Sequence, residues 1–195
     1  IPIGEWVIQE ACKAAQCWQA LTGYDIGIAV NVSPRQFRDP GFTDVVLQAL
    51  ADSHLKPNLL ELEITERLIL DNTIETADIL RQLDTAGIRL SVDDFGTGYS
   101  ALSYLKSYPF DTLKIDKSFI QDVLTDTDDS ALVRAIINMA HSLGLTVIAE
   151  GVEEEAQTHF LKSEHCDYSQ GYFYSRPLPE QEFIHWLESN HRAHI

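Results

Sequence analysis

The feature that most constrains the fold is a repeated alternation of short apolar, β-branched segments with longer segments of helical periodicity. Strands separated by helices predict an α/β protein with a parallel sheet and right-handed crossovers. The predicted strands are Ile26–Asn31, Leu59–Thr65, Arg89–Asp93, Thr112–Ile115, Thr146–Glu150 and Asp167–Tyr174. The predicted helices are Trp6–Thr22, Phe42–Ser53, Thr73–Thr85, Tyr99–Lys106, Ser130–Leu143, Glu153–Lys162 and Glu180–Ser189.

Two architectures satisfy this alternation, an open doubly wound sheet and a (β/α)₈ TIM-type barrel. The chain holds six strand–helix units in 195 residues, whereas a barrel has eight units and takes about 250 residues. A missing N-terminal segment of roughly 55 residues would account for both differences. No glycine-rich phosphate loop follows a predicted strand, which weakens the doubly wound alternative. We therefore expect a single domain over residues 1–195, an incomplete barrel lacking its N-terminal strands and cut from a longer chain.

Composition argues against several classes of partner. The chain has 30 Asp and Glu against 14 Lys and Arg, a net charge of −16, so no broad basic surface for DNA, RNA or anionic lipid is expected. No apolar run approaches the length of a membrane span. Three cysteines without metal-binding spacing favour a reducing compartment. We expect a cytoplasmic segment without membrane contact, and any tether to the inner membrane would lie upstream.

Polar residues gather where the predicted strands end. In a barrel the C-terminal strand ends converge on one mouth, where active sites are built. Carboxylates packed together repel one another unless they are protonated or bridged by cations. Oxygen ligands without His or Cys favour Mg²⁺, Mn²⁺ or Ca²⁺ over zinc. The pattern predicts a carboxylate metal site suited to phosphoester hydrolysis. The residues concerned are Asn31, Glu63, Glu66, Asp93, Asp94, Lys114, Glu150 and Gln170.

Each acid taken alone has a structural alternative. Glu66 could cap the helix that follows it, and Asp94 could be a turn residue before Phe95 and Gly96. Capping is a poorer explanation for acids at several successive strand ends. Lys114 lies within an apolar run, where a lysine has no ordinary surface role. The metal site is therefore the preferred interpretation.

Several motifs resemble those of the EAL-type cyclic-di-GMP phosphodiesterases of bacteria. The resemblance implies a modified (β/α)₈ barrel that uses two Mg²⁺ or Mn²⁺ ions. It implies hydrolysis of one phosphodiester of cyclic-di-GMP to linear pGpG, and a place in bacterial second-messenger signalling and biofilm control. The matching stretches are NVSPRQF (31–37), LELEITE (60–66), DDFGTGYSAL (93–102), LKIDKSFI (113–120), IAEGVE (148–153) and SQGYFYSRPLP (169–179).

The resemblance implies a metal-binding role for four of these residues. Asn31, Glu63 and Asp93 match ligands of the first metal. Asp93 would bridge to a second metal, and Asp94 would complete that second site.

The remaining matches imply catalytic and binding roles. Lys114 resembles the lysine that hydrogen-bonds the attacking water, and Glu150 resembles the general base. Glu66 matches the glutamate that holds the DDFGTG loop, and Gln170 matches a residue of the substrate pocket. Arg35 lies in the right motif to approach a phosphate, but a solvated position at the rim suits it equally well.

The Glu-Ala-Leu signature that gives the family its name does not occur in this chain. In the family its glutamate is a metal ligand, and the signature lies upstream of the segment that matches Ile1–Val7. We therefore expect hydrolysis by a longer parent and inactivity of this chain alone. The alternative is a receptor that binds cyclic-di-GMP without cleaving it, although every other predicted ligand and base is present. The resemblance leaves open a homodimer formed through the DDFGTG loop region, residues 93–98.

Overall fold

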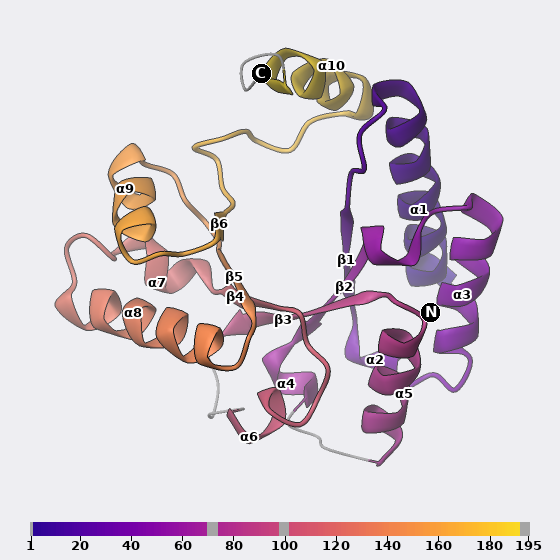
Figure 1. The fold of residues 1–195 in the computed structure, drawn as a ribbon, viewed down its shortest axis with the longest axis horizontal. Coiled ribbons are helices and arrows are strands. Elements are labelled where there is room, and N and C mark those ends of the chain that lie inside the picture. Colours follow the sequence, from indigo (N-terminus) through magenta and orange to yellow (C-terminus); the bar gives the residue numbers. More distant parts are fainter. Residues whose placement is uncertain (1, 70–73, 98–101, 192–195) are drawn as a thin grey trace.

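The computed structural model describes residues 2–69, 74–97 and 102–191. Their centre is a six-stranded parallel sheet in which the strands lie side by side in chain order, from β1 to β6 (Figure 1). The strands are β1 Ile28–Val32, β2 Leu60–Thr65, β3 Arg89–Phe95, β4 Thr112–Ile115, β5 Thr146–Ala149 and β6 Tyr168–Ser169.

The strand order distinguishes the two predicted architectures. A doubly wound sheet reverses its strand order at a switch point, whereas this order advances in one direction throughout. Because parallel crossovers are right-handed, one direction of advance places every crossover helix on the same side of the sheet, as in a (β/α)₈ barrel. The barrel-type α/β architecture is therefore confirmed. Within the described residues β1 and β6 are the two edges of the sheet.

Helices precede, connect and follow the strands. They are α1 Pro2–Thr22, α2 Pro34–Phe37, α3 Phe42–Ser53, the 3₁₀ helix η1 Pro57–Leu59, α4 Glu66–Ile69, α5 Ile74–Thr85, α6 Leu102–Leu105, α7 Lys117–Gln121, α8 Thr127–Ser142, α9 Glu155–Ser163 and α10 Glu180–His191. Sequence periodicity predicted the long helices to within a few residues and missed the short helices α2, η1, α4 and α7, which span too few residues to show a period. Residue 73 and residues 99–101 of two predicted helices lie outside the described residues.

The last predicted strand needs the largest correction. The sequence predicted Asp167–Tyr174, but β6 ends at Ser169. The chain turns immediately afterwards, and the backbone N–H of Tyr174 donates to the carbonyl of Gly171 at 3.1 Å. Gly171 also lies very close to the segment that follows β5, because an added Cβ would fall 2.0 Å from the carbonyl oxygen of Val152. This close approach replaces the strand, and apolar composition alone does not reveal it.

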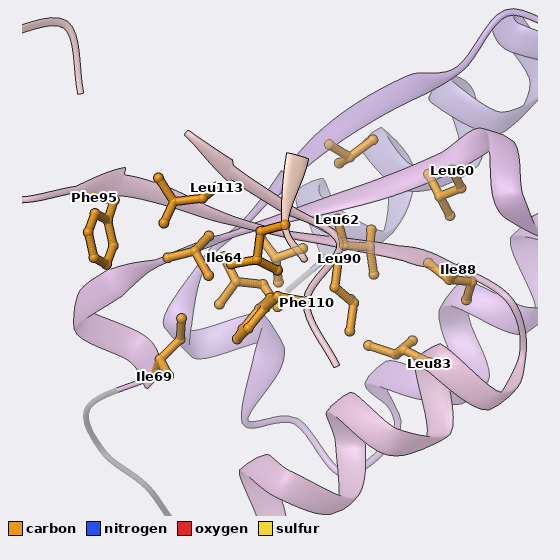
Figure 2. Packing of buried hydrophobic residues seen from close by; sticks show 14 of the residues in the cluster. Leu60, Leu62, Ile64, Ile69, Leu83, Ile88, Leu90, Phe95, Phe110 and Leu113 are labelled. Atoms are coloured by element: carbon orange, nitrogen blue, oxygen red, sulfur yellow. The ribbon is translucent and has the colours of Figure 1, made fainter. Parts of the chain in front are cut away.

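Alternation along the strands gives the sheet two different faces. Leu60, Leu62 and Ile64 of β2 are completely buried and pack in one cluster with residues of α4 and α5 (Figure 2). Glu63, between them, turns to the opposite face. Strands β3 and β4 repeat this pattern, so the face opposite the helices carries buried polar side chains. Those side chains are Glu63, Ser91, Asp93, Thr112 and Lys114.

The end of the chain packs against its beginning. Figure 1 shows α10 beside one end of α1 and across from β6. The Phe183 ring of α10 lies 4.7 Å from the ring of Trp18, and the indole Nε1 of Trp18 donates to Glu180 Oε1 at 3.2 Å. Among the helices of the described residues, none has the length and apolar character that a membrane span requires.

Candidate active site

Lys114 lies at the centre of a charge cluster on the polar face of the sheet. Its Nζ is 2.5 Å from Glu63 Oε1 and 2.5 Å from Glu150 Oε1, and 3.6 Å from Asp93 Oδ1. The Lys114 side chain is only 3% exposed. Burial by itself would lower the pKa of Lys114, but the bonds to Glu150 and Glu63 outweigh burial and raise it. Lys114 is therefore a permanent cation that holds together residues from β2, β3, β4 and the end of β5.

The cluster carries an excess of negative charge, because three carboxylates surround one ammonium group. Burial raises the pKa of Glu63, Lys114 lowers it, and the neighbouring Asp93 and Glu150 raise it again, with a net upward shift. Such an arrangement stabilises additional positive charge. It is chemically suited to a divalent cation, because carboxylate oxygens are the ligands that Mg²⁺ and Mn²⁺ prefer.

A β-bulge brings two consecutive aspartates to this cluster. Along a regular strand, adjacent side chains point to opposite faces. Here Val92 pairs with Leu113 and Phe95 with Ile115, so β3 has one more residue than β4 between these pairs. Asp94 takes up the extra residue with a φ of 55°, a left-handed conformation that Asp tolerates better than most residues. The bulge therefore allows Asp93 and Asp94 to approach the same site.

The two aspartates and Glu150 offer carboxylate oxygens that all lie within 4.8 Å of one another. The carboxyl group of Asp94 also lies next to that of Asp116, the N-cap of α7. Burial and the nearby Asp93 charge raise the pKa of Asp94, whereas bonds from Ser118 outweigh burial and lower that of Asp116. Carboxylate oxygens gathered this closely are suited to a divalent cation, so the residues fit a metal site.

Asp116 is a site residue that the sequence interpretation missed. It follows Lys114 by two positions in the LKID stretch, so a second polar residue at the end of the same strand was the available signal. Its side chain accepts from the backbone N–H of Ser118 at 2.9 Å, as an ordinary helix cap does. This capping role concealed its contact with Asp94.

Glu66 connects α4 to the loop that follows the aspartates. Its side chain is buried, and its Oε2 accepts a hydrogen bond from the backbone N–H of Gly96 at 3.2 Å. Gly96 has a φ of 100°, and an added Cβ would lie 2.8 Å from the Phe119 ring. The loop can therefore adopt this path only with glycine at that position. Residues 98–101 of the DDFGTGYSAL stretch lie outside the described residues.

The other predicted site residues lie around the cluster at different distances. Asn31 of β1 is in register with Glu63 on the neighbouring strand, so both side chains project from the same face. Gln170 follows β6, and its backbone N–H donates to the carbonyl of Ala149 at 2.8 Å, next to Glu150. Arg35 is exposed on α2, and within the described residues no contact joins it to the Lys114 cluster.

Comparison with known proteins places this arrangement in a family. The model of the EAL domain matches residues 1–177. The signaling protein YkoW of Bacillus subtilis is 48% identical over 187 residues, which cover 96% of this chain and 23% of YkoW. The bifunctional diguanylate cyclase/cyclic di-GMP phosphodiesterase MucR of Pseudomonas aeruginosa is 43% identical over 184 residues, which cover 94% of this chain and 27% of MucR. The chain thus spans about a quarter of each of these relatives.

Solved structures agree with the sequence matches. The MucR phosphodiesterase in complex with c-di-GMP has a TM-score of 0.90 at 43% identity, and the alignment covers 93% of this chain and 74% of that one. The EAL domain of Mycobacterium smegmatis DcpA has a TM-score of 0.90 at 38% identity, covering 95% and 84% of the two chains. The matched fold, the matched residues and the carboxylate–lysine cluster lead to one conclusion. This chain belongs to the EAL domain family.

Proposed function

We propose that the protein hydrolyses one phosphodiester bond of cyclic-di-GMP and releases linear pGpG. The observation that carries the proposal is the buried cluster in which Lys114 Nζ lies 2.5 Å from both Glu63 and Glu150. Phosphoester hydrolysis requires stabilisation of negative charge on phosphorus-bound oxygens and removal of a proton from water. Family membership and the cyclic-di-GMP bound to the MucR structure support cyclic-di-GMP as the substrate. We also propose that residues 1–195 belong to one EAL-type domain.

The acidic residues are proposed to hold two Mg²⁺ or Mn²⁺ ions. Asn31, Glu63 and Asp93 would hold the first ion, while Asp93 and Asp94 would hold the second. Divalent cations bound there would supply charge neutralisation on the phosphate and lower the pKa of the attacking water. The carboxylate oxygens of Asp93, Asp94 and Glu150, which lie within 4.8 Å of one another, support this assignment.

Among the side chains of this protein, Lys114 and Glu150 are proposed to take part directly in the reaction. Lys114 Nζ would donate hydrogen bonds to the water and to a phosphoryl oxygen, a contribution typically worth about 10²–10³ in rate. A Glu150 carboxylate oxygen would accept the proton of the water, typically worth roughly 10²–10⁴. The ion pair between the two residues fixes the position of the Glu150 carboxylate beside the Lys114 ammonium group.

Three further residues are proposed to bind substrate or organise the loop. Gln170 and Arg35 would contact cyclic-di-GMP, Gln170 from the turn after β6 and Arg35 from the rim. Glu66 would hold the DDFGTG loop through Gly96.

The test is chromatographic measurement of pGpG formed from cyclic-di-GMP with Mg²⁺ or Mn²⁺. The protein at its natural length should produce pGpG, its Glu150→Gln variant should not, and the exposed Glu155→Gln should behave as the unmodified protein. The 195-residue chain alone is expected to be poorly active, because the Glu-Ala-Leu signature is absent from it. If the natural-length protein binds cyclic-di-GMP tightly but forms no pGpG, it is a receptor and not a phosphodiesterase. If the natural-length protein neither binds nor cleaves cyclic-di-GMP, the proposal is refuted.

A further inference from the structure

Gln157 is a buried polar residue for which the proposed mechanism has no use. It lies in the first turn of α9 and is only 4% exposed. Its Oε1 accepts hydrogen bonds from the backbone N–H groups of Glu153 at 2.8 Å and Glu154 at 3.0 Å. Its Nε2 donates to the carbonyl of Ile120 at 2.9 Å, with the Gln121 carbonyl at 3.5 Å. The carboxamide is thus bonded on both sides.

The bonded groups belong to two segments that each continue from a residue of the charge cluster. Glu153 and Glu154 end the connection from β5 to α9, and this connection begins with Glu150. Ile120 lies in α7, which starts directly after Asp116 at the end of β4. Gln157 therefore cross-links the connection that follows Glu150 to the helix that follows Lys114.

The same two segments also touch at Gly151. Its φ is 70°, and an added Cβ would lie 2.4 Å from the Cβ of Lys117, at the start of α7. The Glu150 backbone N–H donates to the carbonyl of Ile115 at 3.1 Å. Glu150 is therefore fixed to β4 by its own backbone, while the chain after it is fixed to α7 by Gln157. Without Gln157, the polar groups that it satisfies would have to find other partners, and the connection would lose its anchor.

We propose that Gln157 is a positioning residue that holds Glu150 beside Lys114 and Asp94. The inference rests on the proposed function, because it concerns the base of that reaction. A displacement of a reacting group by about 1 Å can reduce a rate by about 10²-fold. The carboxamide touches no reacting atom, and its effect passes through the backbone of residues 150–154.

Two substitutions separate the cross-link from the local helix cap. Gln157→Glu retains an oxygen acceptor for the Glu153 and Glu154 N–H groups but loses the donor to Ile120. Gln157→Met removes both functions with a side chain of similar length. Asp126→Ala is the matched control, because the Asp126 side chain caps α8 by accepting from the N–H groups of Asp128 and Asp129 at 2.7 and 3.3 Å. It removes a helix cap of the same kind from a helix whose start lies outside the charge cluster.

The experiment measures kcat and KM for cyclic-di-GMP, Mn²⁺ affinity by electron paramagnetic resonance, and amide hydrogen exchange of residues 150–154. Both Gln157 variants of the natural-length protein should lose about 10- to 100-fold in kcat, with KM changed less than about twofold. Exchange at 151–154 should accelerate. Mn²⁺ affinity should fall, because the Glu150 carboxylate lies within 4.8 Å of the Asp93 and Asp94 carboxylates that would hold the ion. Asp126→Ala should leave all of these values unchanged.

Two results would overturn the inference. Unchanged kcat in a folded Gln157→Met protein would do so, as would a loss confined to thermal stability, which a purely structural residue would produce. If the unmodified protein forms no pGpG, the proposed function fails separately. Exchange and Mn²⁺ affinity then decide the role of Gln157, since unchanged values refute it and faster exchange with weaker binding supports it.

Discussion

Replacing Lys114 with methionine is expected to destabilise the protein strongly in the absence of divalent cations. The substitution keeps an unbranched side chain, one atom shorter than lysine, and removes the charge that Glu63, Asp93 and Glu150 share. Three carboxylates would then face one another around an apolar side chain. The folded protein could relieve this only by protonating carboxylates, admitting water or opening the sheet.

The magnitude follows from the geometry. Two unit charges 2.5 Å apart interact by about 6–7 kcal/mol at an effective dielectric constant of about 20, so the two short pairs give about 13 kcal/mol. Desolvation of the ions costs several kcal/mol for each and cancels most of this attraction. The net loss on removing one partner of a buried pair is then about 3–5 kcal/mol. A typical domain has only about 5–15 kcal/mol of stability in total, so the change is large.

The assay is denaturant unfolding in a chelator at several pH values. Burial already raises the pKa of Glu63, and loss of Lys114 removes the group that opposes this shift. A folded state with a raised carboxyl pKa binds more protons than the unfolded chain, so its stability falls as pH rises above the ordinary value of 4.5. Lys114→Met should therefore lose stability with rising pH more steeply than the unmodified protein.

Lys56→Met is the matched control for this substitution. Lys56 pairs with Asp25 at 2.9 Å, but both side chains are more than half exposed, so its loss should cost less than about 1 kcal/mol. If the free energy of unfolding of Lys114→Met lies within about 1 kcal/mol of that of the unmodified protein at neutral pH, the buried cluster does not contribute the stability assigned to it.

Three further predictions use simpler measurements. Gly151→Ala should lower the free energy of unfolding by well over about 1 kcal/mol, because it adds a clash to backbone strain. Gly144 has a similar φ of 77° but no atom within 4 Å of an added Cβ, so Gly144→Ala should cost less. Equal losses of the two variants in thermal unfolding would contradict the close contact at Gly151. Mn²⁺ at about 100 times its Kd should stabilise the protein by about 2.7 kcal/mol, a gain that calorimetry should not find in Asp93→Ala. Iodoacetamide at pH 8 should modify exposed Cys17 first, since burial raises the pKa of Cys12 to about 11, and rapid modification of Cys12 seen by mass spectrometry would refute this order.

The sequence by itself determined the fold class and which polar residues stand at the ends of the strands. Strands such as Thr112–Ile115 were placed correctly because a short apolar, β-branched segment between helical segments is a local property of the chain. Acids at successive strand ends indicated one polar mouth, because parallel strands all end on the same side. The strand predicted over Asp167–Tyr174 failed beyond Ser169, since the turn at Gly171 depends on an approach to Val152 that only the folded chain creates.

Tertiary structure decided how the site is assembled. Period-two alternation would send Asp93 and Asp94 to opposite faces, and only the bulge against β4 brings both carboxylates near Glu150. The sequence showed that Lys114 is a charged residue within an apolar segment, but its simultaneous contact with three carboxylates depends on the packing of the strands. Gln157 bonds locally to the backbone at the start of its own helix, but its bond to Ile120 joins residues far apart in the chain. Local patterns encode which face a residue takes, whereas the contacts between elements depend on register, bulges and close backbone approach, which arise only when the sheet forms.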